Sequence, residues 1–285
     1  MSNQLILGDN LEVLKTFPSE SVDLIYIDPP FFSNREYKSC CNVAFNDRWA
    51  GGINHYIGWL YERVEELYRV LKPTGSFYLH CDWHANAYIR VNILDKIFGD
   101  KNFVNEIVWC YSNAGRSKEF FSKKHDSIFL YRKTQNTFWN EKFKIQYSES
   151  YIKSHFTDLD ENNRRCRKRI DAGKWRIYYP EEGMIPNDWW VDIASLNSMS
   201  KERIGYPTQK PEALLERIIK ASSNEGNIVL DAFCGGGTTC AVARRLGRKF
   251  IGIDQSVRAI ELTNIRLNGF NYDLVVYNSD RSSYV

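Results

Sequence analysis

Short apolar runs alternate with helical periods along the first part of the 285-residue chain. The runs that predict β-strands cover 4–9, 22–28 and 76–81. Between the last two runs, apolar side chains recur at intervals of four, three and four residues, at Leu60, Val64, Leu67 and Leu71. This spacing predicts a helix over about 58–71, with Lys72-Pro73-Thr74-Gly75 as its stop. Strand, helix and strand in this order favour a parallel sheet with right-handed crossovers.

The alternation returns in the last part of the chain, with predicted helices over 208–223 and 238–247 and predicted strands over 227–233 and 249–254. The part between, 135–205, is rich in Asn, Arg, Lys, Trp and Tyr and has no long apolar period. We therefore predict a single α/β domain formed by 1–134 together with 206–285. The intervening residues are predicted to be an inserted, surface-rich subdomain.

The strand predicted over 22–28 ends in an unusual way, because Asp28 is followed directly by Pro29, Pro30, Phe31 and Phe32. Prolines stop ladder pairing, and phenylalanines in a tight turn are costly to leave in water. Asp28 and the Pro29 carbonyl can accept hydrogen bonds from an amino group, and Phe31 can stack on a base turned out of a duplex. The alternative is a loop packed into the core, and packing is the role that we favour for Phe32.

A glycine-rich turn, 235–237, follows the strand predicted over 227–233 and lets the backbone approach a ligand. Asp254 ends the next predicted strand 17 residues beyond Gly237, near the offset of roughly 20 residues at which an acid meets ribose hydroxyls. The third glycine of a pyrophosphate-binding GxGxxG motif is absent, and Asp231 suits a cation better than a phosphate. These features favour S-adenosylmethionine, although both acids could instead be strand-end caps.

Three acids, Asp28, Asp231 and Asp254, each end a predicted strand. The carboxyl ends of parallel strands line one edge of a sheet, where open α/β folds bind their ligands. We therefore expect the three carboxylates to converge, which would bring an amine acceptor beside a methyl donor.

These motifs resemble the β-class DNA amino-methyltransferases of restriction-modification and orphan systems, in which a DPP[FY] motif precedes the cofactor motif. DPPF at 28–31 matches the first motif and DAFCGGGTT at 231–239 the second. The resemblance implies a Rossmann-like α/β methyltransferase fold with circularly permuted motif order, and makes 135–205 a target-recognition region. The catalytic residues that it implies are Asp28, Pro29, Pro30 and Phe31. The residues that it implies for cofactor binding are Asp9, Lys210, Asp231, Phe233, Gly235, Gly237, Thr238 and Asp254.

The resemblance implies methyl transfer from S-adenosylmethionine to the exocyclic N6 of a flipped-out adenine, because an acid before Pro-Pro usually accompanies adenine in this family. N4-cytosine methylation on the same scaffold is the alternative. A catalytically inactive nucleic-acid-binding module and a nicotinamide-dependent oxidoreductase are more distant ones. C5-cytosine methylation is disfavoured, since none of the eight prolines precedes the cysteine nucleophile that it needs. Double-stranded DNA is the expected substrate, and a cognate restriction enzyme and a homodimer are compatible with the resemblance.

Basic residues cluster in the predicted insertion, at Arg164, Arg165, Arg167, Lys168 and Arg169. Over 160–180 the seven Lys and Arg residues outnumber the three Asp and Glu residues, and aromatic residues follow the cluster. This composition favours contacts with DNA phosphates, with a solvated charged face as the alternative. Arg116, Lys118, Lys123 and Lys124 can extend the basic surface.

Bulk composition adds a few exclusions. The net charge of +3 is too small to indicate a polyanion partner by itself, and no apolar run reaches the roughly 18 residues of a membrane span. With no signal-peptide pattern, we expect a cytoplasmic protein. Seven scattered cysteines without a CxxC pair are expected to be reduced. For HCDWH at 80–84 we expect no metal site, and Asp82, Trp83 or His84 either lines the base pocket or caps the next helix.

Overall fold

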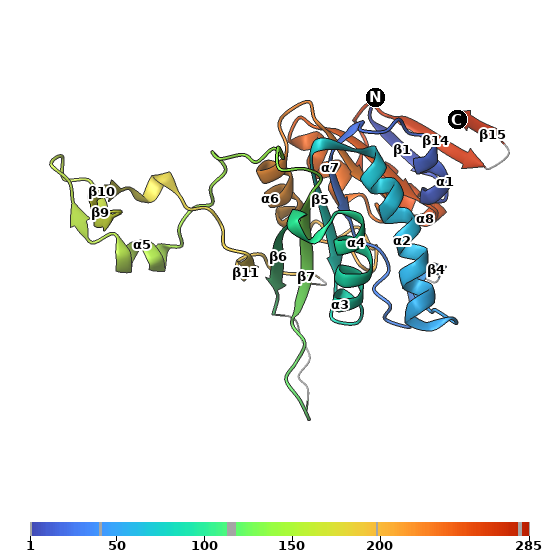
Figure 1. The fold of residues 1–285 in the computed structure, drawn as a ribbon, viewed down its shortest axis with the longest axis horizontal. Coiled ribbons are helices and arrows are strands. Elements are labelled where there is room, and N and C mark those ends of the chain that lie inside the picture. The colour runs from blue at the N-terminus through green and yellow to red at the C-terminus, as the bar shows by residue number, and fades with distance from the viewer. Residues whose placement is uncertain (1, 40–41, 113–117, 198, 279–280, 285) are drawn as a thin grey trace. The chain divides into compact units, whose positions relative to one another are not determined.

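A computed structural model describes residues 2–39, 42–112, 118–197, 199–278 and 281–284. The chain divides into two compact units. The main unit comprises Met1–Asn140 and Asp188–Val285, and the small unit comprises Glu141–Asn187 (Figure 1).

A ten-stranded sheet runs through the described part of the main unit. In spatial order its strands are β11 (Trp189–Trp190), β6 (Phe103–Cys110), β7 (His125–Arg132), β5 (Leu71–Cys81), β2 (Val22–Ile27), β12 (Ile228–Asp231), β13 (Lys249–Asp254), β1 (Gln4–Leu7), β14 (Asp273–Asn278) and β15 (Arg281–Tyr284). The six strands from β5 to β14 are parallel to one another. Strand β7 is antiparallel to both of its neighbours, so β6 runs in the same direction as β5. The expected parallel α/β sheet is therefore present.

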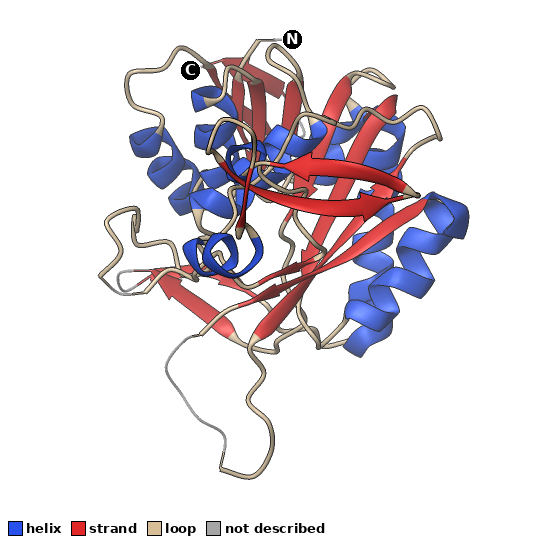
Figure 2. Ribbon diagram, turned by 90° about the vertical axis from the view of Figure 1, so that its left-hand side faces the viewer, coloured by secondary structure: helices blue, strands red, loops and turns tan. Residues whose placement is uncertain are grey.

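Helices cover both faces of this sheet (Figure 2). One face packs against α1 (Asn10–Lys15), α2 (Gly52–Val70), α3 (Asn86–Ile89) and α4 (Asp95–Ile97). The other packs against α6 (Glu212–Ser222), α7 (Thr238–Arg245) and α8 (Val257–Arg266). Side chains of β2 alternate between the two cores, with Ile25 and Ile27 in the first and Leu24 and Tyr26 in the second. Burial on both faces explains why β2 is apolar from Leu24 to Ile27, whereas its half-buried Asp23 pairs with Lys72.

All three predicted helices differ from the observed ones at their ends, and α7 differs least, because it ends at Arg245, two residues before its predicted end. Helix α2 begins at Gly52 because Tyr56, one turn before Leu60, extends the buried stripe. It ends at Val70, and Leu71 is already the first residue of β5. Helix α6 begins only at Glu212, because Pro211 lacks an N–H and disfavours a helical residue before it. The segment before α6 is thereby extended and free to line a cavity.

The small unit contains α5 (Glu149–His155) and an antiparallel sheet of β8 (Asp158–Leu159), β9 (Arg165–Asp171) and β10 (Lys174–Tyr178). Its residue range, Glu141–Asn187, is shorter than the predicted insertion, 135–205. Residues 188–205 lie in the main unit, because β11 pairs with β6 and the Trp109 indole donates a hydrogen bond to the Ile193 carbonyl (2.8 Å). The remaining described elements are the hairpin of β3 (Glu36–Ser39) and β4 (Asn42–Asn46), a π-helical segment between α3 and α4 (Arg90–Leu94), and two 3-10 turns (Asp100–Asn102 and Pro180–Glu182).

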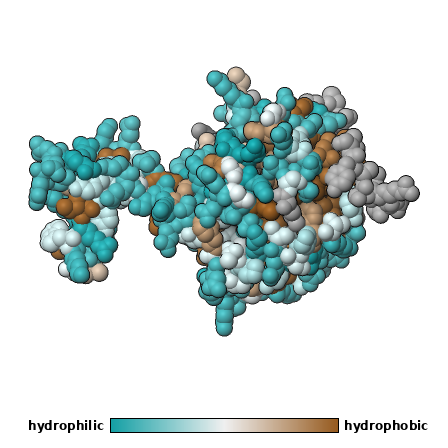
Figure 3. All heavy atoms as spheres, turned by 90° about the horizontal axis from the view of Figure 1, so that it is seen from above, coloured by the Kyte–Doolittle hydropathy of each residue, from teal (hydrophilic) through white to brown (hydrophobic). Residues whose placement is uncertain are grey.

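The surface of the main unit is predominantly hydrophilic in the view of Figure 3. Among the described helices, none has the length and apolar character needed to cross a membrane. The five cysteines in the described ranges are free thiols. Cys40 and Cys41 lie outside the described residues.

Candidate active site

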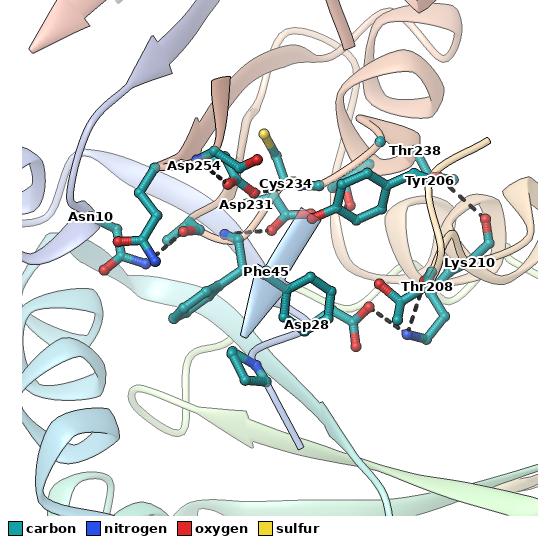
Figure 4. A pocket seen from close by; sticks show the side chains of 18 of the residues that line it. Asn10, Asp28, Phe45, Tyr206, Thr208, Lys210, Asp231, Cys234, Thr238 and Asp254 are labelled. Atoms are coloured by element: carbon teal, nitrogen blue, oxygen red, sulfur yellow. Dashed lines mark hydrogen bonds and ion pairs between the residues drawn. The ribbon is translucent and has the colours of Figure 1, made fainter. Parts of the chain in front are cut away.

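A cavity of about 440 Å³ opens at the carboxyl ends of β2, β12 and β13. It brings together Asp28, Asp231 and Asp254, which come from three different strand ends (Figure 4). The other predicted site residues that line it are Asp9, Pro30, Lys210, Phe233, Gly235 and Thr238. Gly237 is the residue before α7, next to this lining. Parallel strand order thus produces the convergence that the sequence predicts.

Asp28 has one paired and one unpaired carboxylate oxygen. Its Oδ2 forms an ion pair with Lys210 Nζ, and both side chains are largely buried. Its Oδ1 is buried and has no hydrogen-bond partner among the described residues. Burying a carboxylate oxygen without a hydrogen-bond donor costs free energy. This oxygen can therefore accept a hydrogen bond from a ligand.

A second cavity of about 30 Å³ adjoins the first and shares Asp28 and Lys210 with it. Its lining includes Pro29 and Phe31, so the DPPF segment lies between the two cavities. The phenyl ring of Phe31 lies 5.0 Å from Lys210 Nζ, measured to the ring centroid. The two prolines and the ring that are predicted to be catalytic therefore lie around one carboxylate.

The loop after DPPF is fixed by Asp47, a residue that the sequence analysis did not identify. The fully buried Asp47 carboxylate accepts hydrogen bonds from the Phe32 N–H (3.1 Å), the Ser33 N–H (2.7 Å) and the Trp49 indole (2.8 Å). The Phe32 ring packs into the core, as expected, at a backbone φ of 61°. This strained conformation persists because the hydrogen bonds from the Phe32 and Ser33 N–H groups to Asp47 hold the loop.

Phe31 rests on a buried hydrogen-bonded chain that the sequence analysis also missed. The His80 ring lies 5.6 Å from the Phe31 ring between centroids, and it is bonded to the Tyr26 hydroxyl (2.8 Å) and to Asp126 (3.1 Å). Tyr111 donates to the other Asp126 oxygen (2.9 Å). Burial opposes ionisation of Asp126, but the bonds from His80 and Tyr111 outweigh it and lower the pKa of the carboxyl. An ionised Asp126 accepts a hydrogen bond from His80 Nε2–H (3.1 Å).

Two acids lie beside the glycine-rich turn: Asp231, which ends β12, and Asp254, which ends β13. The Asp231 carboxylate accepts from Thr239 Oγ1 (2.5 Å) and the Phe233 N–H (3.0 Å), and the Asp254 carboxylate accepts from the Gly235 N–H (2.9 Å). Burial nevertheless raises the pKa of Asp231 to about 7 and the pKa of Asp254 to about 6. Both acids therefore exist in water-poor surroundings where an added positive charge or hydroxyl donor stabilises the ionised form.

Glycine is required at two points of this turn. Gly235 has a φ of +49°, and a Cβ there would lie 2.8 Å from the Tyr206 ring. Gly237 has a φ of +69°, and a Cβ would lie 2.5 Å from Thr263. Both positions favour glycine by backbone conformation and by close packing.

Asp9 lies at the far end of the large cavity and caps α1. Its carboxylate accepts from the Leu11 N–H (2.9 Å) and pairs with Arg63 (2.9 Å). The neighbouring Asn10 donates to the Ala232 carbonyl (2.7 Å) and so connects α1 to the glycine-rich turn. These bonds fix Asp9 at the cavity wall.

The predicted DNA-contacting residues all lie in the small unit, on β9 or just before it. Arg164 pairs with Glu181, and Arg169 pairs with Asp171 (2.9 Å), so part of the basic excess is neutralised locally. Arg167 donates to the Tyr151 hydroxyl (3.1 Å). The remaining two cations, Arg165 and Lys168, are exposed on β9. Contact of these residues with DNA stays a prediction.

The HCDWH segment contributes to neither of the two cavities. Asp82 accepts from the His84 N–H and its ring Nδ1 (2.9 and 2.7 Å, respectively), which makes a local turn at the end of β5. Trp83 stacks on His84 and is 46% exposed. Within the described residues, no group of three metal-ligating side chains occurs.

The sequence profile of a family described as DNA methylase, comprising N6 and N4 methyltransferases, matches residues 22–264. The chain belongs to this DNA methylase family. It is therefore an S-adenosylmethionine-dependent DNA amino-methyltransferase, and DNA is its substrate.

Several relatives of this methylase are similar over most of their length. Type II methyltransferase M.HpaI of Haemophilus parainfluenzae is 34% identical over 95% of this chain and 77% of its own. DNA adenine methyltransferase YhdJ of Escherichia coli is 33% identical over 93% and 82%, respectively.

Solved structures share the fold at lower identity. The PvuII cytosine-N4-specific DNA methyltransferase superposes with a TM-score of 0.63 at 18% identity, over 95% of this chain and 89% of its own. A protein assigned as a DNA modification methylase from Thermus thermophilus, in complex with S-adenosyl-L-methionine, gives 0.61 at 20% identity over 95% and 97%. These likenesses establish the Rossmann-like methyltransferase fold.

The large cavity of this methylase fits S-adenosylmethionine. Four of its lining residues are acids, and its one lysine is already paired with Asp28. An acidic, phosphate-repelling lining suits a ligand that carries a sulfonium, an ammonium and ribose hydroxyls. Its volume lies within the range of about 300–1,000 Å³ that is typical of small-molecule sites.

Proposed function

We propose that this methylase transfers the methyl group to the exocyclic N6 of adenine in duplex DNA, with Asp28 as the acceptor of the amino group. The observation that carries the proposal is the buried, unpaired Asp28 Oδ1 at the boundary of the two cavities. The 33% identity to a protein named as an adenine methyltransferase supports adenine over cytosine. N4-cytosine methylation remains the second candidate, because the same carboxylate can accept from that amine.

Asp28 and Lys210 have different roles in binding the amine. Lys210 holds Oδ2, which leaves Oδ1 directed to the substrate. A hydrogen bond from the amine to Oδ1 and a second to the Pro29 carbonyl align the nitrogen and favour its tetrahedral form. The carboxylate also stabilises the positive charge that the nitrogen gains in the transition state. When bound, S-adenosylmethionine supplies an electrophilic methyl group on a positively charged sulfur.

Phe31 and its supports hold the base. His80 fixes the Phe31 ring from behind, and the ring offers its other side for stacking, which is worth about 1–3 kcal/mol per base. The smaller cavity, about 30 Å³, is too small for a purine. Base binding therefore requires Tyr37 and Phe45, which stack on one another at its rim, to move.

For the cofactor, we propose that Asp254 accepts from the ribose hydroxyls and that Asp9 contacts the adenine side of the cavity. Asp231 and the turn residues Phe233, Gly235, Gly237 and Thr238 surround the methionine part. Residues 135–205, with Arg164, Arg165, Arg167, Lys168 and Arg169, are proposed to recognise the target sequence. A cognate restriction enzyme and a homodimer stay predictions.

The methylated base decides between the two candidates. We expect DNA from cells that express the chain to contain N6-methyladenine, measured by mass after digestion to nucleosides, with DNA from cells expressing Asp28→Ala as the control. Sequencing that reports modified bases then gives the recognition site. N4-methylcytosine as the sole product would replace the proposed substrate with the second candidate.

Cofactor affinity should rise with pH between about 5 and 7. The pKa values of Asp231 and Asp254, raised to about 7 and about 6 by burial, leave both acids partly protonated at the lower pH. A protonated carboxyl attracts the sulfonium less and accepts hydroxyl donors less well, so each deprotonation favours binding, by at most tenfold per pH unit and group. Titration calorimetry with S-adenosylmethionine measures this dependence.

Two variants sharpen the pH test. Asp254→Asn should bind weakly and lose the part of the pH dependence near 6, whereas the exposed Asp100→Asn should behave as wild type. An affinity that is constant, or that falls, from pH 5 to 7 in the wild-type protein would contradict the proposed cation and hydroxyl contacts.

A further inference from the structure

Between β6 and β7 the chain leaves the sheet, and its described residues 118–124 return to it (Figures 1 and 2). Strand β6 ends at Cys110 and β7 begins at His125, and these two residues pair. Because β6 runs in the same direction as β5 and β2, the end of β6 lies on the edge that carries Asp28. The loop therefore projects from the rim onto which the target base must be delivered.

The stem of this loop is tied to the active site. The Tyr111 N–H donates to the Lys124 carbonyl (3.0 Å), and the Tyr111 hydroxyl donates to Asp126, which holds His80 behind Phe31. Lys123 Nζ lies 3.2 Å from the centroid of the Trp83 ring at the end of β5. These contacts hold Lys123 and Lys124, at the end of the described segment 118–124, against the main unit.

Two adjacent phenylalanines lie in the described segment 118–124. The side chain of Phe120 is 82% exposed and that of Phe121 is 100% exposed. Burying such a side chain stabilises it by about 1.5–3 kcal/mol. Two adjacent exposed rings therefore indicate a binding surface. Three lysines and one glutamate accompany the two rings in 118–124.

This combination of rings and cations fits duplex DNA. The phenyl rings match the apolar faces of base pairs, and the lysines match the phosphates on either side. Flipping a base costs a few kcal/mol of lost stacking, and it leaves a gap in the duplex beside the protein edge that receives the base.

We propose that Phe121, with Phe120, inserts into the DNA at the target position and fills the gap left by the flipped base, while Lys118 and Lys123 contact the flanking phosphates. The proposal rests on base flipping in the proposed function. Stacking of about 1–3 kcal/mol per ring would offset much of the extrusion cost. The rings lie outside both cavities and take no part in the methyl transfer itself.

The test compares two DNA duplexes that carry the recognition site. In one the target base is correctly paired, and in the other it faces an abasic position, so that extrusion is already easy. We expect Phe121→Ala and the double variant Phe120→Ala/Phe121→Ala to lose about tenfold or more in kcat/KM on the paired duplex and less than about threefold on the abasic one. Phe121→Trp should restore activity on the paired duplex.

A matched control is Ile265→Ala, which removes an apolar side chain that is 65% exposed on α8 and should change neither rate. Lys123→Ala should reduce the slope of log affinity against log salt by about one, whereas the phenylalanine variants should leave the slope unchanged.

The outcomes separate this proposal from the proposed function. If the wild-type protein methylates neither duplex, the proposed function fails. If the wild-type protein is active and Phe121→Ala keeps its full kcat/KM, or loses kcat/KM equally on both duplexes, the proposed insertion of Phe121 into the DNA is wrong. Phe121-dependent binding to anionic phospholipid vesicles that DNA does not displace would assign the rings to a membrane and would also overturn it.

Discussion

The Asp28→Asn variant is expected to lose about 10²- to 10⁴-fold in the rate of methyl transfer while it still binds S-adenosylmethionine. The amide has nearly the shape of the carboxylate and keeps an oxygen for Lys210, so the loop and the large cavity should persist. It loses the negative charge that accepts the amine proton and that stabilises the developing positive charge on nitrogen. Because the amide fills the same volume and the other three lining acids are unchanged, the affinity for the cofactor should change little.

Two measurements check this expectation on the same samples. Transfer of labelled methyl groups to DNA gives the rate, and equilibrium binding of S-adenosylmethionine shows that the fold and the cofactor site are intact. Asp100→Asn makes the same chemical change at an exposed turn and should be fully active. Activity of Asp28→Asn within threefold of wild type would remove the catalytic role from Asp28.

The residues that the sequence could identify share one property: each follows directly from strand order. Asp28, Asp231 and Asp254 end strands that the apolar runs mark clearly, and parallel pairing places the ends of such strands together. The register of β1 beside β13 adds Asp9 to the same edge. Periodicity and topology were therefore sufficient for the three acids, whereas the other predicted lining residues, such as Asp9 and Lys210, came from the family resemblance.

The residues that support the site could not be found in this way. Asp126 meets His80 only because β7 inserts antiparallel beside β5, a pairing that no spacing in the sequence reveals. Asp47 acts from a loop, through hydrogen bonds to the backbone of Phe32 and Ser33 that any sequence could offer. Such side chains are polar residues in unremarkable surroundings until the fold buries them.

Substitutions of Lys210 and Asp28 should have strongly non-additive effects on the free energy of unfolding. Their side chains are 11% and 15% exposed, so Lys210→Met leaves a buried carboxylate without a partner. Removing one member of a buried pair costs about 3–5 kcal/mol in the free energy of unfolding, whereas replacing both by neutral groups of similar size is often nearly neutral. We therefore expect Lys210→Met to be much less stable than the double variant Asp28→Asn/Lys210→Met.

Denaturant unfolding of the four proteins of this cycle measures the coupling. The control is the pair Lys72 and Asp23, which are 2.7 Å apart and have a lysine that is 35% exposed, where Lys72→Met should cost only about 0–1 kcal/mol. If the losses of the two single variants at Asp28 and Lys210 simply add in the double variant, the pair contributes no coupling. Lys210 would then not be what holds Oδ2, and the orientation of the free Asp28 oxygen would have to come from the proline turn alone.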